Sequence, residues 1–394
     1  MMNFTGRRFL KTRLRIHFRK EMYLEIALRG MVIGIDARMY GPKVGGGGLG
    51  RYLEQLITQL QEIEKQNRFV LFLKPNNFDD CQITNPLFSK IKIDIHWYTL
   101  REQWALGKII DDYHLDLVHF PHWNVPWKIK TPFIVTIHDL ILLDEPRSAK
   151  TTTRHPLIHF IKYQGYKKVL ARAIKRARHI IAVSEFTRQT VQKHFPTTAP
   201  EKISVIHEGV TQFLSARPTP EPKKNPAPYF LYVGNAYPHK NLEFLISTFA
   251  MFKKTHPTSR LIIAGHEDVF FKKTKTLGVA EFISDPTDAD LQNLYSNAQI
   301  FIFPSRLEGF GLPPLEAMRA DVPVVASNRG SLPEILGDAA VYFNPQSSEE
   351  LLTAMETIST DENLRQNMIR KGQTQVAKFS FRKMAEETMK IYAR

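Results

Sequence analysis

The chain has 394 residues, of which 43% are hydrophobic and 24% are charged. This composition excludes a disordered or fibrous protein, and the length predicts two globular domains. Cys81 is the single cysteine, which excludes an internal disulfide framework and a cysteine-based structural zinc site and fits a reducing cytoplasm. Its thiol stays a candidate nucleophile. The sequence has no apolar run of about 18 residues or more, so we expect no membrane-spanning helix.

The formal net charge of +15 indicates an anionic partner, which is nucleic acid, phospholipid head groups or a phosphorylated substrate. Residues 1–30 are strongly basic, with Glu21 and Glu25 as their only acidic residues. Three interpretations of this leader stay open: an extension or a start codon placed too early, a basic helix on a membrane surface, or an arm that binds nucleic acid. It lacks the apolar segment of a secretory signal.

After Met31, short β-branched or aromatic runs alternate with longer amphipathic stretches, which is typical of a parallel α/β sheet. The predicted strands of the first half are residues 32–36, 69–73, 91–98, 117–120, 133–137, 179–183 and 203–207. Residues 217–228, "RPTPEPKKNPAP", are dense in proline and charge, which predicts a linker. We therefore expect an N-terminal Rossmann-like domain at residues 31–216.

A second α/β series follows this linker. Its predicted strands are residues 229–233, 260–264, 280–283, 300–304, 322–326 and 340–343. We expect a C-terminal Rossmann-like domain at residues 229–375 and a last helix, within 376–394, that packs back on the N-terminal domain. Both halves are predicted to be doubly wound, and ligands of such sheets bind beyond the carboxyl ends of the strands.

A glycine-rich loop follows the first predicted strand, in "GPKVGGGGLGRY", and we expect a helix to begin near Arg51. Glycines at a strand-to-helix turn let backbone amides approach a phosphate, and the helix dipole favours its charge. The lysine and hydroxyl pair of a P-loop is absent, and the dinucleotide fingerprint fits poorly. By itself the loop is compatible with a phosphate or sugar contact and with a flexible turn.

The strongest pattern is "FIFPSRLEGFGLPPLEAM", residues 301–318. A strand is followed by a glycine-bearing loop with Glu308, and Pro313 and Pro314 favour the opening of a helix that carries Glu316 in its first turn. Taken alone, Glu316 could simply complement the helix dipole and Glu308 could be a solvated charge. Two carboxylates flanking a loop at a helix N-terminus also suit the binding of a sugar and a phosphate.

The spacing of Glu308 and Glu316 resembles the E-x7-E signature of the family 4 glycosyltransferases, which have the GT-B fold of two Rossmann-like domains facing across a cleft. Further segments resemble that family in the usual order: "TIHDL" from Thr136, "IIAVSEFTRQTV" from Ile180, "SVIHEGV" from Ser204, "FLYVGNAYPHKNLEFLI" from Phe230 and "PVVASNRGSLPEILGDAAVYFNP" from Pro323. The similarity covers essentially Val32 to Arg394. It is specific for the family and much less so for the substrate.

The resemblance implies roles for individual residues. Glu316 is expected to hold the ribose hydroxyls and Glu308 to orient the hydroxyls of the donor sugar. Lys240 is expected to neutralise the leaving diphosphate, and His138 to lie beside the donor sugar. His138, Lys240 and Glu308 are thus the predicted catalytic residues. The remaining predicted donor-binding residues are Gly47, Gly48, Gly234, Asn235, Ile283 and Gly309, together with Phe310, Gly311 and Leu312, whose amides are expected to cradle the sugar and the diphosphate.

One position departs from the family pattern. Many relatives have an arginine after the first glycine of the lysine loop, whereas this chain has Asn235 after Gly234. A neutral amide does not replace that charge. Either Arg306, Lys43 or Arg188 provides a second phosphate clamp, or Lys240 acts alone. The family usually needs no metal, and we expect no metal site and no cofactor beyond the donor.

The expected reaction is transfer of a hexose, with retention, from a nucleotide sugar to a saccharide or lipid-linked saccharide in cell-surface polysaccharide synthesis. "TIHDL" and "PHKN" look most like branches that use GDP-mannose, with a UDP-sugar as the alternative donor. A sugar phosphorylase, a nucleotide-sugar epimerase and a basic nucleic-acid-binding protein are the rival functions, the last without a recognised motif. The basic residues 162–178 fit an anionic membrane surface, which predicts a cytoplasmic enzyme peripheral to the inner face of the cell membrane.

Overall fold

The fold is described from a computed structural model, which defines residues 30–45, 47–148, 155–210 and 228–394. The chain contacts group it into two compact units, one of residues 1–135 with 176–178 and one of residues 136–175 with 179–394. Nearly all of the predicted leader and of the predicted linker lies outside the described residues. The domain boundaries given above therefore stay predictions.

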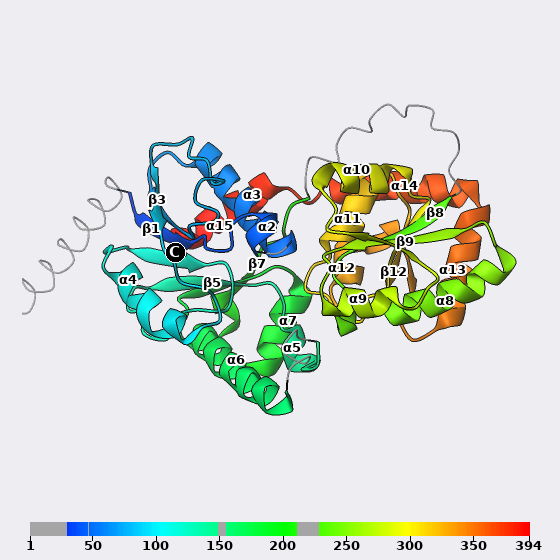
Figure 1. Ribbon diagram of the computed structural model, residues 1–394. Helices are drawn as coiled ribbons and strands as arrows, with labels where there is room; N and C mark the ends of the chain where they lie inside the picture. The colour runs from blue at the N-terminus through cyan, green and yellow to red at the C-terminus, as the bar shows by residue number, and fades with distance from the viewer. Residues whose placement is uncertain (1–29, 46, 149–154, 211–227) are drawn as a thin grey trace, which may run out of the picture. The chain divides into compact units, whose positions relative to one another are not determined.

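The first sheet has seven parallel strands in the order β3-β2-β1-β4-β5-β6-β7 (Figure 1). The strands are β1 (Val32–Asp36), β2 (Arg68–Leu73), β3 (Phe88–Lys92), β4 (Leu117–Phe120), β5 (Phe133–Ile137), β6 (His179–Ala182) and β7 (Ile203–Val205). The helices between them are α2 (Pro42–Gly45), α3 (Gly47–Ile63), η1 (Glu102–Leu106), α4 (Gly107–Asp111), α5 (Ile141–Asp144), α6 (Pro156–Arg176), α7 (Glu185–His194) and η3 (Pro200–Lys202).

The second sheet has six parallel strands in the order β10-β9-β8-β11-β12-β13. The strands are β8 (Tyr229–Val233), β9 (Arg260–Gly265), β10 (Glu281–Ser284), β11 (Ile300–Phe303), β12 (Val324–Ser327) and β13 (Ala340–Phe343). The helices are η5 (Pro238–Lys240), α8 (Leu242–Thr255), α9 (Val269–Lys275), α10 (Asp288–Asn297), α11 (Leu312–Arg319), α12 (Leu332–Leu336), η6 (Gly337–Ala339), α13 (Ser348–Thr360), α14 (Glu362–Val376) and α15 (Phe381–Tyr392). The sequence order reverses between β8 and β11, which makes their carboxyl ends the switch point where such sheets bind ligands.

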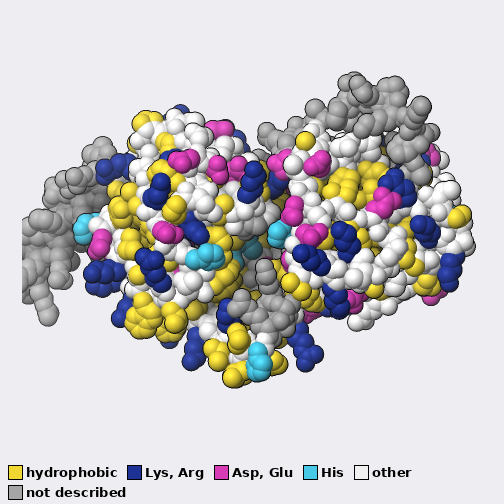
Figure 2. All heavy atoms as spheres, viewed as in Figure 1, with side chains coloured by type: hydrophobic (Ala, Val, Ile, Leu, Met, Phe, Trp, Pro, Cys, Tyr) yellow, Lys and Arg dark blue, Asp and Glu magenta, His cyan; other side chains and the backbone are white. Residues whose placement is uncertain are grey.

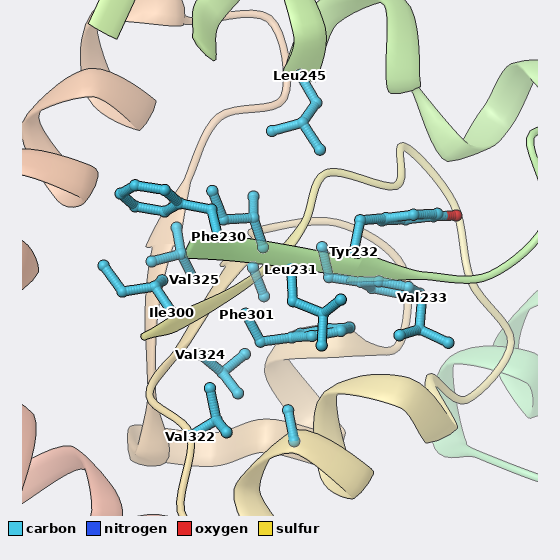
Figure 3. Close-up of a cluster of buried hydrophobic side chains, with 14 of the residues drawn as sticks. Phe230, Leu231, Tyr232, Val233, Leu245, Ile300, Phe301, Val322, Val324 and Val325 are labelled. Atoms are coloured by element: carbon cyan, nitrogen blue, oxygen red, sulfur yellow. The ribbon is translucent and has the colours of Figure 1, made fainter. Parts of the chain in front are cut away.

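The core of the second sheet explains why these runs form strands. Side chains of β8 alternate between the two faces, so Phe230 packs on Phe249 and Phe252 of α8, while the hydroxyl of Tyr229 donates to the Leu294 carbonyl of α10. Figure 3 shows Leu245 of α8 on the Phe230 side and Leu231 pointing the other way. Because helices cover both faces, the central strands β8 and β11 are apolar and buried at every position, as is typical of parallel sheets.

One predicted strand was placed wrongly. The aromatic and β-branched run at residues 91–98 was predicted as a strand, but β3 is Phe88–Lys92. Phe88 stacks on Phe69 of β2 with 4.6 Å between ring centroids, which fixes the register. The neighbouring strand β2 ends at Leu73, whose carbonyl accepts from the Ile93 amide, so later residues have no strand to pair with.

The last helix lies close to β7. A Cβ added at Gly209, a few residues after β7, would lie 2.2 Å from the backbone nitrogen of Phe381, so only glycine fits against the start of α15. At the other end of α15, the Arg394 guanidinium donates to the Ser204 hydroxyl at 3.4 Å. Within the described parts of the chain, no helix is long and apolar enough to cross a membrane.

A buried ion network stands at the switch point of the first sheet, between β1 and β4. The Arg38 guanidinium donates to both carboxylate oxygens of Asp36 at 2.8 Å and to Glu102 Oε1 at 2.6 Å, and Asn124 donates to the same Glu102 oxygen at 2.7 Å. Burial raises the pKa of Glu102, and the Arg38 charge opposes that shift. Nearby, burial raises the pKa of the Cys81 thiol to about 11, which makes this candidate nucleophile unreactive.

We predict that Arg38→Met lowers the free energy of unfolding by about 3 to 5 kcal/mol at neutral pH, because it leaves two carboxylates buried without their cation. Burial raises the pKa of Glu102 in the folded state, so the folded variant takes up a proton at a higher pH than the unfolded chain does. The difference from wild type should therefore shrink as the pH falls. Urea titrations at neutral and mildly acidic pH measure it.

The control is Arg382→Met. Its side chain is 61% exposed and pairs with Glu386 one turn away, so its loss should change stability by less than about 0.5 kcal/mol. Equal stability of the two variants would show that the Arg38 network does not hold the first sheet together.

Candidate active site

Lys240 and Glu308 form an ion pair at the switch point of the second sheet. Lys240 ends the short helix η5 after β8, and Glu308 lies in the loop after the neighbouring strand β11. The ammonium nitrogen donates to Glu308 Oε1 at 2.6 Å, and the two side chains are only 13% and 9% exposed. The structure therefore brings together the two residues that were predicted to act on the diphosphate and on the sugar.

The backbone after Lys240 is held in an uncommon conformation. Asn241 is left-handed, with φ of 62°, and its side-chain amide donates to the carbonyls of Pro304 and Pro345 at 3.3 and 2.9 Å. Asparagine tolerates this region better than most residues because its side chain hydrogen-bonds locally. These bonds anchor η5 to the end of β11 and so fix where Lys240 points.

Glycines allow the loop with Glu308 to pack closely against other backbone. A Cβ added at Gly309 would lie 1.8 Å from the His138 carbonyl oxygen, and one added at Gly330 would lie 2.8 Å from the Glu308 nitrogen. The Ser184 hydroxyl at the start of α7 donates to the Gly309 carbonyl at 2.6 Å. The Glu308 loop is thereby locked next to the loop that carries His138.

The N-terminus of α11 presents backbone amides. Gly311 precedes the helix with φ of 102°, which favours glycine, and the prolines at 313 and 314 have no N–H to leave unsatisfied. No hydrogen bond between described residues uses the amides of Phe310, Gly311 or Leu312. The side chain of Phe310 is buried against Phe379, so only its amide can serve a ligand. This is a helix N-terminus of the kind that binds anions.

Glu316 was predicted in the first turn of its helix, but α11 begins at Leu312, so Glu316 lies in the second turn, where it is 7% exposed. The hydroxyl of Tyr295, from α10, donates to Glu316 Oε2 at 2.9 Å. The bond orients the carboxylate. A glutamate that only complemented the helix dipole would not need such a hydrogen-bond partner.

His138 follows β5 and forms a pair that sequence reasoning missed. Its Nδ1 lies 2.8 Å from Glu208 Oε1, and Glu208 is 4% exposed at the loop after β7. Because a carboxylate only accepts, Nδ1 carries the proton, and the pair fixes the tautomer and the ring orientation. Glu208 belongs to the "SVIHEGV" segment, and an acidic residue before a glycine at the end of a strand was the signal that could have found it.

The other predicted donor residues are placed as follows. Gly234, with φ of 150°, and Asn235 follow β8, where the Asn235 carbonyl accepts from the Tyr232 hydroxyl at 2.7 Å. Ile283 lies in β10 and packs partly on the core of the second sheet. Their proposed contacts with a donor stay predictions.

The glycine-rich segment differs from the prediction. The helix α3 begins at Gly47, not near Arg51, so Gly47 and Gly48 are exposed residues of its first turn. The reason lies at Gly50, where a Cβ would come 2.1 Å from the Gly41 carbonyl oxygen, so α3 packs tightly on the segment before it. Nothing lies within 4 Å of a Cβ at either Gly47 or Gly48, which leaves their backbone accessible.

Among the candidates for a second clamp, Arg306 adjoins the lysine loop. Its amide donates to the His239 carbonyl at 2.7 Å, and its guanidinium donates to the Pro238 carbonyl and to Glu145, each at 3.1 Å. Its buried Nε has no partner among the described residues. Both arginines have a carboxylate partner, but Arg306 donates to one oxygen of Glu145, whereas Arg188 is engaged by both oxygens of Glu185. Lys43 belongs to the other compact unit.

Two further observations concern possible metal sites and surface hollows. In the described part of the chain, no group of three or more His, Cys, Asp and Glu side chains is placed to hold a metal ion. A surface hollow of about 370 Å³ lies beside α13, lined by Tyr342, Thr353 and Ile358 among others, and it includes none of the predicted site residues.

Comparisons with known proteins agree with this geometry. The family "Glycosyltransferase Family 4" matches residues 46–211, and the family "Glycosyl transferases group 1" matches residues 216–375. An O-antigen chain mannosyltransferase B of Escherichia coli is 27% identical over 88% of this chain and 95% of its own length. The sucrose-phosphate synthase of Thermosynechococcus elongatus superposes with a TM-score of 0.74 and 20% identity, covering 92% of this chain and 98% of the other. The Anabaena protein HepE, solved with UDP-glucose, gives 0.69 and 16%, covering 92% and 99%.

The chain therefore belongs to the family 4 glycosyltransferases. It is a glycosyltransferase of the GT-B fold, with two parallel α/β sheets, as the sequence predicted.

We predict that Lys240 and Glu308 are energetically coupled. Lys240→Met and Glu308→Gln should each lower stability, and the double variant should lose less than the sum, with a coupling energy of about 1 to 3 kcal/mol. Removing one partner leaves the other charge buried alone, whereas removing both does not. Urea unfolding of the four proteins measures the cycle.

The matched control is the pair of Lys273 and Glu243, whose atoms lie 3.0 Å apart but whose side chains are 73% and 66% exposed. Its coupling should stay below about 1 kcal/mol because solvent screens it. A coupling at Lys240 and Glu308 no larger than this control contradicts the prediction.

Proposed function

We propose that the chain transfers a hexose, mannose, from a nucleoside diphosphate sugar to a saccharide or lipid-linked saccharide in the synthesis of a cell-surface polysaccharide. The observation that carries this proposal is the buried pair of Lys240 and Glu308 beside the amides at the start of α11. A cation and a helix N-terminus suit a diphosphate, and a carboxylate suits sugar hydroxyls. Both halves of the donor are thereby matched within one site.

The identity of the donor is inferred from likeness. The E. coli relative is a mannosyltransferase by name, and "TIHDL" and "PHKN" favour GDP-mannose. HepE was solved with UDP-glucose, which keeps a UDP-sugar as the alternative. The net charge of +15 fits an anionic donor and an anionic membrane surface, which supports a lipid-linked acceptor and a place on the inner face of the cell membrane.

The proposed reaction retains the configuration of the sugar. The bond between C1 of the sugar and the diphosphate oxygen breaks, and the acceptor oxygen bonds to C1 on the same face. The acceptor proton passes to the departing phosphate oxygen, and the nucleoside diphosphate leaves. No enzymic nucleophile is needed, in contrast to a retaining glycosidase with two carboxyls about 5 Å apart.

Each site residue has a part in this step. Lys240 and the α11 amides stabilise the charge that grows on the leaving diphosphate. Glu308 accepts from hydroxyls of the donor sugar and Glu316 from the ribose diol. His138 lies beside the sugar, with its ring held by Glu208. Arg306 supplies the second positive charge that Asn235 lacks, since it adjoins η5 and has a buried Nε without a partner among the described residues.

A panel of nucleotide sugars tests the proposal. GDP-mannose should give the largest thermal shift and the fastest release of nucleoside diphosphate, also in the presence of a chelator, and Lys240→Ala should abolish most of that release. A response to a UDP-sugar alone would correct the donor and keep the reaction. Phosphate-dependent breakdown of a disaccharide, or epimerisation of the nucleotide sugar without transfer, would replace the reaction by one of its rivals.

We predict that Glu316→Ala weakens the binding of GDP by about 1 to 3 kcal/mol, because two hydrogen bonds from the ribose diol to a carboxylate are lost. Titration calorimetry measures this affinity. Tyr295→Phe, which removes the hydroxyl bonded to Glu316 Oε2 but keeps the carboxylate, should lose less. Unchanged affinity of the Glu316 variant would exclude the ribose role.

We predict that Arg306→Gln weakens the binding of GDP about tenfold, as expected for one charge-assisted hydrogen bond to the diphosphate. Arg188→Gln removes the same charge from a guanidinium that Glu185 already engages, so its affinity should equal that of the wild type. If the two variants bind GDP equally well, Arg306 is not the second clamp.

A further inference from the structure

The first turns of α6 project from the fold. The buried residues of this helix are Tyr166, Leu170, Ala173 and Ile174, and none of residues 156–165 is buried. Four large apolar side chains in that free end are exposed: Leu157 at 60%, Ile158 at 43%, Phe160 at 57% and Ile161 at 60%. Single exposed apolar residues need no explanation, but a cluster of this kind marks an interaction site.

The spacing of residues orients this helix. With about 100° between successive residues, Leu157, Ile161, Lys168 and Lys175 fall on one stripe that faces away from the four buried residues. We call it the outer stripe of α6. Its N-terminal part is apolar and its later part is basic, and Lys168 and Lys175 are both exposed. Figure 2 shows hydrophobic and basic side chains together at the end of the molecule where Figure 1 places α6.

The charge of α6 has one sign. Its 21 residues, "PLIHFIKYQGYKKVLARAIKR", include six lysines and arginines and no aspartate or glutamate. A basic helix with exposed large apolar residues is typical of attachment to an anionic membrane surface, where the apolar side chains enter the boundary between head groups and acyl chains. A protein partner would have to offer a large acidic surface with an apolar pocket within it.

We propose that the outer stripe of α6 docks on an anionic lipid surface. Leu157 and Ile161 enter the bilayer boundary, flanked by Ile158 and Phe160, while Lys168 and Lys175 lie on the phosphate head groups. This attachment rests on the proposed function in one respect: docking would bring the active site to a lipid-linked acceptor. The docking itself requires neither donor nor transfer.

The experiment is sedimentation of the full chain with vesicles of phosphatidylcholine alone or with phosphatidylglycerol. The wild type should bind only the anionic vesicles and be released by salt, because salt screens exposed charges. Leu157→Ser with Ile161→Ser should reduce binding by about tenfold or more, since two large apolar side chains leave the bilayer. Lys168→Gln with Lys175→Gln should reduce it by a similar factor.

Matched controls separate binding through the outer stripe of α6 from nonspecific hydrophobic and electrostatic binding to vesicles. Met251→Ser with Val269→Ser removes two apolar side chains that are 49% and 54% exposed elsewhere, and Lys272→Gln with Lys275→Gln removes two exposed lysines. Both controls should bind like wild type. Equal binding by the α6 variants and their controls overturns the proposal. A wild type that binds no vesicles overturns it as well. So does the finding that substitution of Leu157 and Ile161 changes the oligomeric state and not lipid binding. Donor hydrolysis in solution should be unchanged in every variant, so a failed donor assay and a failed docking assay are distinguishable.

Discussion

The ion pair of Lys240 and Glu308 is the interaction on which the site depends. Two opposite charges that are almost fully buried cost desolvation, which close contact and additional bonds must offset. Here the atoms are 2.6 Å apart, and the backbone around both is fixed by tight packing at Gly309 and Gly330 and by the bonds of Asn241. The pair is thus held where the two loops meet. In the proposed function, the diphosphate of the donor competes with Glu308 for the lysine.

The topology of the sheet explains why these residues meet. Lys240 and Glu308 are distant in sequence, but β8 and β11 are neighbours at the switch point, so the loops after them meet at the same edge of the sheet, with the ammonium 2.6 Å from the carboxylate. The helix α11 begins directly after the Glu308 loop, at Leu312. The His138 carbonyl packs on Gly309 of this loop. In the proposed function, binding and catalysis use the cations Lys240 and Arg306, the carboxylates Glu308 and Glu316, His138 with Glu208, and the N-terminus of α11.

Much of this could be predicted from the sequence. The strands are short apolar runs, and β1, β4, β5, β8 and β13 begin and end where the pattern predicts. The strand predicted at residues 91–98 was wrong because an aromatic and β-branched run forms a strand only beside another strand. The neighbouring strand β2 ends at Leu73, before it could pair with residues after Ile93. The helix boundary at Gly47 was missed because glycine usually marks a turn, whereas here it serves close packing of a helix.

The remaining features depend on contacts between distant residues, which no local pattern contains. Glu208 meets His138 across 70 positions of sequence, and Glu102 meets Arg38 across 64. The choice among the candidate clamps likewise required knowing that Glu185 engages Arg188 and that Arg306 adjoins η5.

The central claim is that the leaving diphosphate takes Lys240 from Glu308. Titration calorimetry of GDP with wild type and Glu308→Gln tests it most directly. Two like charges about 4 Å apart repel by up to about 4 kcal/mol at an effective dielectric constant near 20, so removal of the carboxylate should tighten GDP binding about tenfold or more, even after screening. Glu243→Gln, at an exposed lysine pair, should leave the affinity unchanged. Equal or weaker binding of GDP by the Glu308 variant would contradict the account.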